Sequence, residues 1–324
     1  MRRGMGDASG GATARLASMT ADPERNATEV VDLHTTLSAV SIERDVVRVS
    51  GPDAVGYLQG QASQDVAALG VGASARSFVL QPAGKVDAWL RVTRTGDDEF
   101  VLDLDPGHGE ALVARLRRFL LRTKAEVDPL DWQTTALRGP GADAAAREAM
   151  AELAVPAGWP GVEGVDLLGP HVRPPLAVPE ADVAAYESAR VRSGVPAMGA
   201  ELTEATIPAE VGQWVIDASV SFTKGCFTGQ ELVARIDSRG GNVPRHLRGL
   251  DIPGPVAPPL DAALVVDDAE VGRVTSVAPR PGDDGVVALA VVGRAVTPPA
   301  AGLVRVDGHG GSVAATVVEL PFGD

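Results

Sequence analysis

The chain has 324 residues, a length that predicts two or three domains. Its 43 acidic and 29 basic residues give a formal net charge of −14, and so acidic a surface argues against non-specific nucleic-acid binding, which depends on neutralising phosphates. The longest uninterrupted apolar run, Val286–Val292, is far shorter than the ~20 residues of a membrane span, so we expect no membrane association.

The N-terminal part predicts a disordered lead followed by a compact body. Residues 1–27 are rich in Gly, Ala and Ser, have no periodicity and lack the apolar stretch of a secretory signal. A body is predicted over 28–244. It begins with a strand at Asp45–Val49, and Asp53 is expected to cap a short helix over 54–61.

A hairpin, a third strand and a helix come next. The apolar stretches Arg76–Leu80 and Val86–Thr93 flank the turn QPAGK, and Phe100–Leu104 is a further strand. His108–Arg122 has an apolar stripe at helical spacing. This order of elements predicts an α+β fold with antiparallel sheets.

The remaining elements divide into helices and then strands. Helices are predicted at Ala144–Leu153 and Val183–Arg192. Residues 245–324 contain short strands punctuated by Pro and Gly, which predicts a C-terminal antiparallel β-barrel or sandwich. These strands are His246–Ile252, Ala263–Val266, Glu270–Val277, Val286–Val292 and Ser312–Glu319.

Cys226 is the single cysteine of the chain, so an internal disulfide is excluded and a reducing, cytoplasmic location is expected. One thiolate cannot hold an iron–sulfur cluster, whose usual ligand set is four cysteines. The five histidines are scattered, and we expect no protein-borne metal site.

The segment around Cys226 carries the clearest chemistry. Thr228 and Glu231 have the spacing of a capping box, which predicts a helix from about Gly229. The positive end of that helix and the cation of Lys224 would both stabilise a thiolate at Cys226. The alternative is a buried cysteine with a purely structural role.

The stretch KGCFTGQELVAR resembles the KGC[YF]xGQE signature of the YgfZ family of folate-binding proteins, a branch of the aminomethyltransferase (glycine cleavage T-protein) superfamily. Residues 51–66 and 81–88 are similar to further segments of that family, and the resemblance extends over about 35–324. It implies ferredoxin-like subdomains that form a ring around a central hole, with a C-terminal barrel. It also implies that the hole holds tetrahydrofolate or a one-carbon derivative.

The resemblance also implies site residues. Cys226, Lys224 and Asp87 are candidates for the chemistry, and Asp87 also for folate binding. Arg192 stands where the T-protein has a pterin-binding Glu, and an Arg cannot accept the same protons. We expect the hole to be lined by Gln59–Asp65, Asp87 and Arg192, with Cys226 on a separate loop. The candidate folate contacts are Gln59, Gln61, Gln64, Asp65, Asp87, Trp89, Arg192 and Trp214.

Two functions follow from the resemblance. The first is a folate-binding protein that assists assembly or repair of iron–sulfur enzymes, with client or assembly proteins as partners and Cys226 as the essential residue. The alternative is a folate-dependent aminomethyl or one-carbon transferase. A cluster of basic residues is either a solvated helix face or a landing site for a polyglutamate tail or RNA phosphates. It comprises Arg115, Arg117, Arg118, Arg122 and Lys124.

Overall fold

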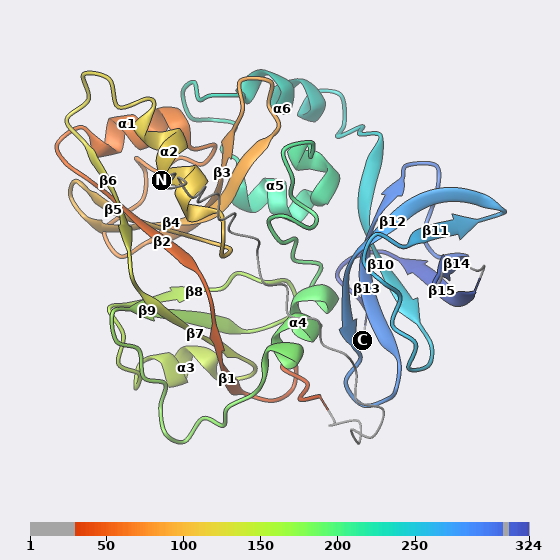
Figure 1. The fold of residues 1–324 in the computed structure, drawn as a ribbon. Helices are drawn as coiled ribbons and strands as arrows, with labels where there is room; N and C mark the ends of the chain where they lie inside the picture. The colour runs from red at the N-terminus through yellow and green to blue at the C-terminus, as the bar shows by residue number, and fades with distance from the viewer. Residues whose placement is uncertain (1–29, 307–310, 324) are drawn as a thin grey trace, which may run out of the picture.

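The computed structural model describes residues 30–306 and 311–323, so the predicted disordered lead 1–27 lies outside the described residues. Three β-structures make up the protein: a five-stranded sheet, a four-stranded sheet and a closed barrel. Figure 1 shows them arranged around the middle of the molecule, with the barrel to one side of the two sheets. Every pairing between the named strands is antiparallel.

The five-stranded sheet has the order β3-β4-β5-β2-β6. Two helices, α1 (Ala54–Gln61) and α2 (Gly109–Arg117), pack their apolar residues against one of its faces. Strands β2, β4, β5 and β6 with these helices form the ferredoxin-like arrangement, to which β3 adds an edge strand. The strands are β2 (Asp45–Ser50), β3 (Ser74–Leu80), β4 (Val86–Gly96), β5 (Glu99–Leu104) and β6 (Glu126–Leu130).

The four-stranded sheet has the order β1-β7-β9-β8 and is covered on one face by the short helix α3 (Ala142–Ala146). Its strands come from distant parts of the chain, since β1 precedes the five-stranded sheet and pairs with β7 after it. The strands are β1 (Ser38–Ile42), β7 (Gln133–Arg138), β8 (Leu153–Pro156) and β9 (Gly164–Gly169).

Helix α4 (Val183–Arg192) contacts β1 of the four-stranded sheet and β12 and β13 of the barrel, and therefore joins these two structures. The 3₁₀ helix η1 (Pro208–Val211) and helices α5 (Gln213–Ser219) and α6 (Gln230–Asp237) follow it. The barrel closes in the order β10-β13-β12-β11-β14-β15. Its strands are β10 (Arg245–Ile252), β11 (Ala263–Val266), β12 (Ala269–Pro279), β13 (Val286–Gly293), β14 (Ala300–Arg305) and β15 (Ser312–Val318).

The predicted α+β class and the C-terminal antiparallel barrel are confirmed. The longest helix of the described residues, α4, has 10 residues, and no helix among them could cross a bilayer. The prediction of a helix over Ala144–Leu153 was wrong beyond Ala146, because Met150 forms a β-bridge with Arg173 and Leu153 begins β8.

Two further local expectations need correction. The predicted helix His108–Arg122 ends at Arg117, and the chain then turns through Arg122, whose φ is +63°. Asp53 stands at the N-cap of α1, but its carboxylate accepts a hydrogen bond from the Lys124 N–H at 2.7 Å instead of capping the helix. A carboxylate can satisfy either donor, and only the three-dimensional arrangement decides between them.

Candidate functional site

Cys226 lies exposed on the loop of residues 221–229, which joins α5 to α6. This loop packs against the C-terminal end of α1, where the Thr228 N–H donates to the Gly60 carbonyl at 3.1 Å. Figure 1 shows α1, the β3–β4 hairpin and α6 at the same end of the molecule. Segments from three regions of the sequence therefore lie together around the loop that carries the thiol. Because Cys226 is exposed, the alternative of a buried structural cysteine is excluded.

The ammonium of Lys224 fixes the loop to α1. Its Nζ donates to the carbonyls of Gln59 at 2.7 Å, Ala62 at 2.7 Å and Gln64 at 2.9 Å. The last carbonyls of a helix have no intrahelical partner, and a cation is favourable at that end of the helix dipole. Partial burial lowers the pKa of Lys224 to about 8, although the nearby Asp65 carboxylate acts in the opposite direction.

Two glycines allow the β3–β4 turn to approach the start of α6. Gly229 has φ +82°, and a Cβ there would lie 2.5 Å from the Gln81 carbonyl oxygen. A Cβ on Gly84, with φ +80°, would lie 2.5 Å from the Cβ of Leu232. The QPAGK turn and the Cys226 segment, which are separate motifs in the sequence, thus form one packed unit.

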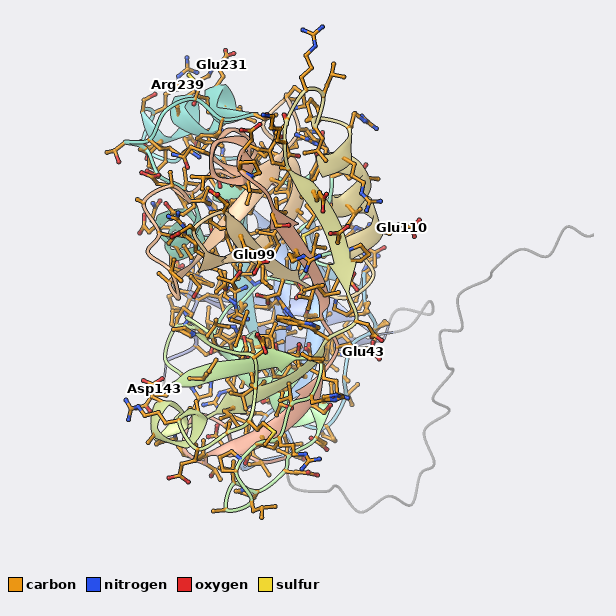
Figure 2. The ribbon with its side chains drawn as sticks, turned by 90° about the vertical axis from the view of Figure 1, so that its left-hand side faces the viewer. Glu43, Glu99, Glu110, Asp143, Glu231 and Arg239 are labelled. Carbon is orange, nitrogen blue, oxygen red and sulfur yellow. The ribbon has the colours of Figure 1, made fainter. Side chains whose placement is uncertain are left out.

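The predicted capping box was wrong. Gly229 is the N-cap of α6, and the described residues provide no side-chain cap there. Instead the Gln230 side-chain oxygen accepts from the Phe227 N–H at 3.1 Å, which stabilises the loop immediately before the helix. Glu231 forms an ion pair with Arg235 on the exposed side of α6 and points outward in Figure 2.

Gln59, Gln64 and Asp65 lie at this loop. The Gln59 side-chain amide donates to the Asp65 carboxylate at 2.9 Å, and that of Gln64 donates to the Ala218 carbonyl at 3.1 Å. Cys226 thus lies on a loop of its own, and Lys224 of that loop contacts residues 59–64 through three backbone carbonyls. The lining of a folate hole by Gln59–Asp65 stays a prediction. In the sequence Lys224 is only a cation two residues from the sulfur, whereas in the structure its ammonium binds the end of α1.

Gln61 and Asp87 are joined by Arg115 of α2. The Arg115 guanidinium donates to the Gln61 side-chain oxygen at 3.0 Å and forms an ion pair with Asp87 at 3.1 Å. Asp87 thus contacts the helix-covered side of the sheet. These two predicted folate contacts adjoin the end of α1 that carries the Cys226 loop.

Trp89 and Trp214 lie together, with their ring centroids 6.3 Å apart in an edge-on arrangement. Trp89 is only 4 % exposed and its indole N–H donates to the Ser219 hydroxyl at 2.9 Å. The guanidinium of Arg76 lies 4.7 Å from the Trp89 ring centroid. Trp89 is therefore a core residue whose ring also packs against the Arg76 guanidinium.

Arg192 lies apart from the Lys224 contacts. Its guanidinium forms an ion pair with Asp32 at 2.7 Å, and its backbone carbonyl accepts from the Phe322 N–H at 2.9 Å. These contacts link the end of α4 to segments near both ends of the described chain. The structure thus divides the predicted folate contacts among at least three places.

A buried charge network missed by the sequence analysis joins the two sheets. Arg91 of β4 forms two hydrogen bonds of 2.9 Å with Asp103 of β5 and one of 2.8 Å with Asp166 of β9. Arg44 also pairs with Asp103, and Arg138 with Asp166, both at 2.8 Å. These guanidinium groups hold the pKa of each carboxyl below its usual range despite burial. Charged residues within otherwise apolar strands are the sequence signal that could have revealed this network.

Arg76 is the cation in this region that lacks a carboxylate. Its guanidinium donates to the Ala157 carbonyl at 3.0 Å, and no carboxylate of the described residues forms an ion pair with it. Burial, together with the positive charges of Arg91 and Arg44, lowers the pKa of Arg76 to about 10. The network therefore contains a cation able to accept an anionic partner.

An open cavity of about 560 Å³ adjoins this network through Arg44. It lies between the β1–β2 connection, the segment after β5, and α4. Its lining combines charged and apolar side chains, which include Asp105, Tyr186, Arg190 and Met198. A volume of this size is in the range of small-molecule sites.

Comparison with known proteins agrees with this architecture. Residues 245–324 match the glycine cleavage T-protein C-terminal barrel domain. The structure of the glycine cleavage system aminomethyltransferase T from Bartonella henselae superposes with a TM-score of 0.71 at 23 % identity, covering 90 % of this chain and 88 % of that one. At that identity the likeness establishes the fold.

Two sequence relatives are informative. The tRNA-modifying protein YgfZ of Edwardsiella ictaluri is 26 % identical over 60 % of this chain and 65 % of its own length. A mitochondrial homologue of the iron–sulfur cluster assembly factor IBA57 from Mycosarcoma maydis is 29 % identical over 61 % of this chain and 53 % of its own length. The alignments thus span less than two thirds of either relative. Together with the barrel-domain match and the fold, they show that this chain is similar to YgfZ-like proteins of the glycine cleavage T-protein superfamily.

Proposed function

We propose that this protein binds a folate and assists the assembly or repair of iron–sulfur enzymes through Cys226. The observation that carries the proposal is the presentation of the thiol: Cys226 is exposed, while Lys224 beside it makes three hydrogen bonds to the end of α1. Such a loop holds a reactive group in a defined position for a partner. The names of the relatives, an iron–sulfur assembly factor and a tRNA-modifying protein, are consistent with such a role.

A single thiol limits the chemistry to transient steps. A thiolate is a soft ligand and a nucleophile, but one sulfur is too few for a resident cluster. Cys226 would therefore bind iron of a partner's cluster as one thiolate ligand, only together with groups of that partner. An exposed, unpaired thiol also suits a reducing compartment such as the cytoplasm.

Folate binding is proposed beside the buried charge network that joins the two sheets, because the side chains there have the charge and the aromatic rings that a folate would contact. A folate carries carboxylates and rings, and Arg76 offers a guanidinium beside the Trp89 ring that forms no ion pair with a carboxylate of the described residues. The neighbouring cavity adds Arg44 and the aromatic ring of Tyr186. These residues would hold the ligand in place of Gln59, Gln64 and Asp65: the side chains of Gln59 and Asp65 are hydrogen-bonded to each other, and that of Gln64 to the Ala218 carbonyl. A bound tetrahydrofolate derivative would supply a one-carbon unit.

Deletion of the gene followed by complementation tests the proposal. The activities of several [4Fe–4S] enzymes are expected to fall on deletion, to recover with the wild-type gene, and to stay low with Cys226→Ala. Gly225→Ala, a change next to Cys226 where an added Cβ meets nothing within 4 Å, is the matched control and is expected to restore activity. Equal recovery with Cys226→Ala and wild type would remove the basis of the proposal.

Folate-dependent aminomethyl or one-carbon transfer remains the alternative, because the fold is that of an aminomethyltransferase. The position of Arg192 argues against it. This residue replaces the Glu implied by the resemblance, and its guanidinium is engaged with Asp32. Production of a methylene-folate from an aminomethyl donor by the purified protein would favour the alternative.

A further inference from the structure

A second surface adjoins the Cys226 loop. We define the basic–apolar patch as the exposed residues that follow α2: Arg118, Phe119, Leu121, Arg122 and Lys124. Leu121 is 86 % exposed and Phe119 is 42 % exposed, which is unusual for large apolar side chains this close together. Among the described residues, no carboxylate forms an ion pair with Arg118, Arg122 or Lys124.

This patch is continuous with the Cys226 loop. The Arg115 guanidinium lies 4.1 Å from the Phe119 ring centroid and also donates to Gln61 at the end of α1. The neighbouring residue Gly60 accepts the Thr228 N–H. The end of α1 is therefore in contact with the patch on one side and with the thiol-bearing loop on the other, and all three lie at the end of the molecule where Figure 1 places α1 and α6.

We propose that the basic–apolar patch docks an acidic protein segment that presents an apolar side chain, and so brings a partner's site to Cys226. The proposal rests on the proposed function, since it names the partner surface for that thiol. Carboxylates of the segment would pair with Arg118, Arg122 and Lys124, and its apolar side chain would cover Leu121 and Phe119. Exposed apolar surface beside cations is typical of a protein interface.

A protein partner fits better than RNA. Nucleic-acid affinity depends on the number of phosphates neutralised, and the patch offers only three uncompensated cations. The chain carries a net charge of −14, which repels a long polyanion that extends beyond the patch more than a short acidic segment that covers only the patch. Leu121 forms no favourable contact with a phosphate, whereas an apolar side chain of a protein partner would bury its exposed surface.

Binding of labelled probes to the full-length protein tests this inference. The first probe is an acidic peptide of about 12 residues with a central Leu-Phe pair, and the second is the same peptide with Ser-Ser in place of that pair. The third is a single-stranded RNA of about equal charge. Binding is measured by fluorescence anisotropy at about 50 and about 200 mM salt. The Leu-Phe peptide is expected to bind most tightly. The double variant Arg118→Glu/Arg122→Glu and the variant Leu121→Ser are each expected to weaken it about tenfold or more.

Matched controls lie far from the patch. Arg147 follows α3 and Leu176 is fully exposed on the connection to α4, so Arg147→Glu and Leu176→Ser change charge and apolar surface elsewhere. Asp143 of α3 is at the opposite end of the molecule from Glu231 in Figure 2. Both control variants are expected to bind the Leu-Phe peptide like wild type. Tighter binding of RNA, absence of peptide binding, or equal losses in the controls would overturn the inference.

The same variants separate this inference from the proposed function. Cys226→Ala is expected to bind the peptide like wild type while failing to restore the iron–sulfur enzymes. The double charge reversal is expected to fail in both assays, with its exposed thiol still alkylated by iodoacetamide at the wild-type rate. If the double variant lost the peptide yet restored the enzymes fully, the docking surface would be refuted while the role of Cys226 would stand.

Discussion

Gly84 and Gly229 face each other where the β3–β4 turn meets the start of α6. A Cβ atom on Gly229 would lie 3.2 Å from the Gly84 Cα and 2.5 Å from the Gln81 carbonyl oxygen. Both glycines have positive φ, and both close contacts involve the backbone or the first side-chain atom of a neighbour. Neither position can accept a side chain without displacing the loop that carries Cys226.

Gly229→Ala is therefore expected to destabilise the protein by about 2 kcal/mol, since it combines backbone strain with a steric clash. Urea denaturation measures the change, and the rate of Cys226 alkylation reports on the loop itself. Gly225→Ala is the matched control in the same loop, because a Cβ there meets nothing within 4 Å. Equal stability of the two variants would contradict the packing described here.

The ammonium of Lys224 predicts a pH dependence of stability. Its pKa is about 8 in the folded protein against an ordinary value of 10.5, so the unfolded chain binds more protons between these values. The free energy of unfolding contributed by this group therefore rises as the pH increases from about 8 to 10.5. Urea denaturation of wild type and Lys224→Met across this range measures the effect.

We expect the free energy of unfolding of wild type to increase relative to that of Lys224→Met as the pH rises. Lys85→Met is a control on the neighbouring turn. A difference that stays constant with pH would show that the ammonium titrates alike in the folded and unfolded chains.

The buried pair of Arg91 and Asp103 predicts a large loss of stability on neutralisation. Asp103→Asn leaves the guanidinium groups of Arg91 and Arg44 with less compensation, and breaking a buried pair costs about 3–5 kcal/mol. Asp128→Asn is the control, because Asp128 is 39 % exposed in its ion pair with Arg48 and such pairs contribute about 0–1 kcal/mol. Chemical denaturation at neutral pH distinguishes the two.

The same network predicts sensitivity to acid. The pKa of Asp103 and that of Asp166 are lowered by their arginine partners, so their stabilisation is present above the unfolded pKa of about 4 and is lost as the pH falls below it. Asp103→Asn should flatten this loss. A variant that kept the steep wild-type acid dependence would place the responsible carboxylates elsewhere.

Arg76 predicts the position of folate binding. Arg76→Gln is expected to weaken tetrahydrofolate binding about tenfold in calorimetry, because it removes the guanidinium that would pair with a folate carboxylate. Urea denaturation of the same variant measures the separate effect of losing the Ala157 and Trp89 contacts. Cys226→Ser is expected to leave the Kd within about tenfold of wild type. A Cys226→Ser variant that lost binding, with Arg76→Gln unaffected, would instead place the folate at the exposed loop.

Local patterns in the sequence were sufficient for much of the architecture. Apolar alternation identified β2, β4 and most barrel strands, because side-chain direction in a strand depends only on the neighbouring residues. The strands of the four-stranded sheet escaped prediction: β8 has only four residues, and β1 and β7 are recognisable as neighbours only once the chain between them has folded. Motif spacing likewise identified the loop around Cys226.

The sequence by itself determined the fold class and the C-terminal barrel and singled out the Cys226 segment as the candidate site, since these depend on local periodicity and on an uninterrupted motif. Contacts between distant residues decided what each polar side chain does. Lys224 and Gln59 are 165 residues apart, yet the ammonium of one binds the carbonyl of the other. Arg91, Asp103 and Asp166 come from three strands in two sheets. Hydrogen bonds and ion pairs act over a few ångströms, so only the folded backbone selects these partners from the many donors and acceptors of the chain.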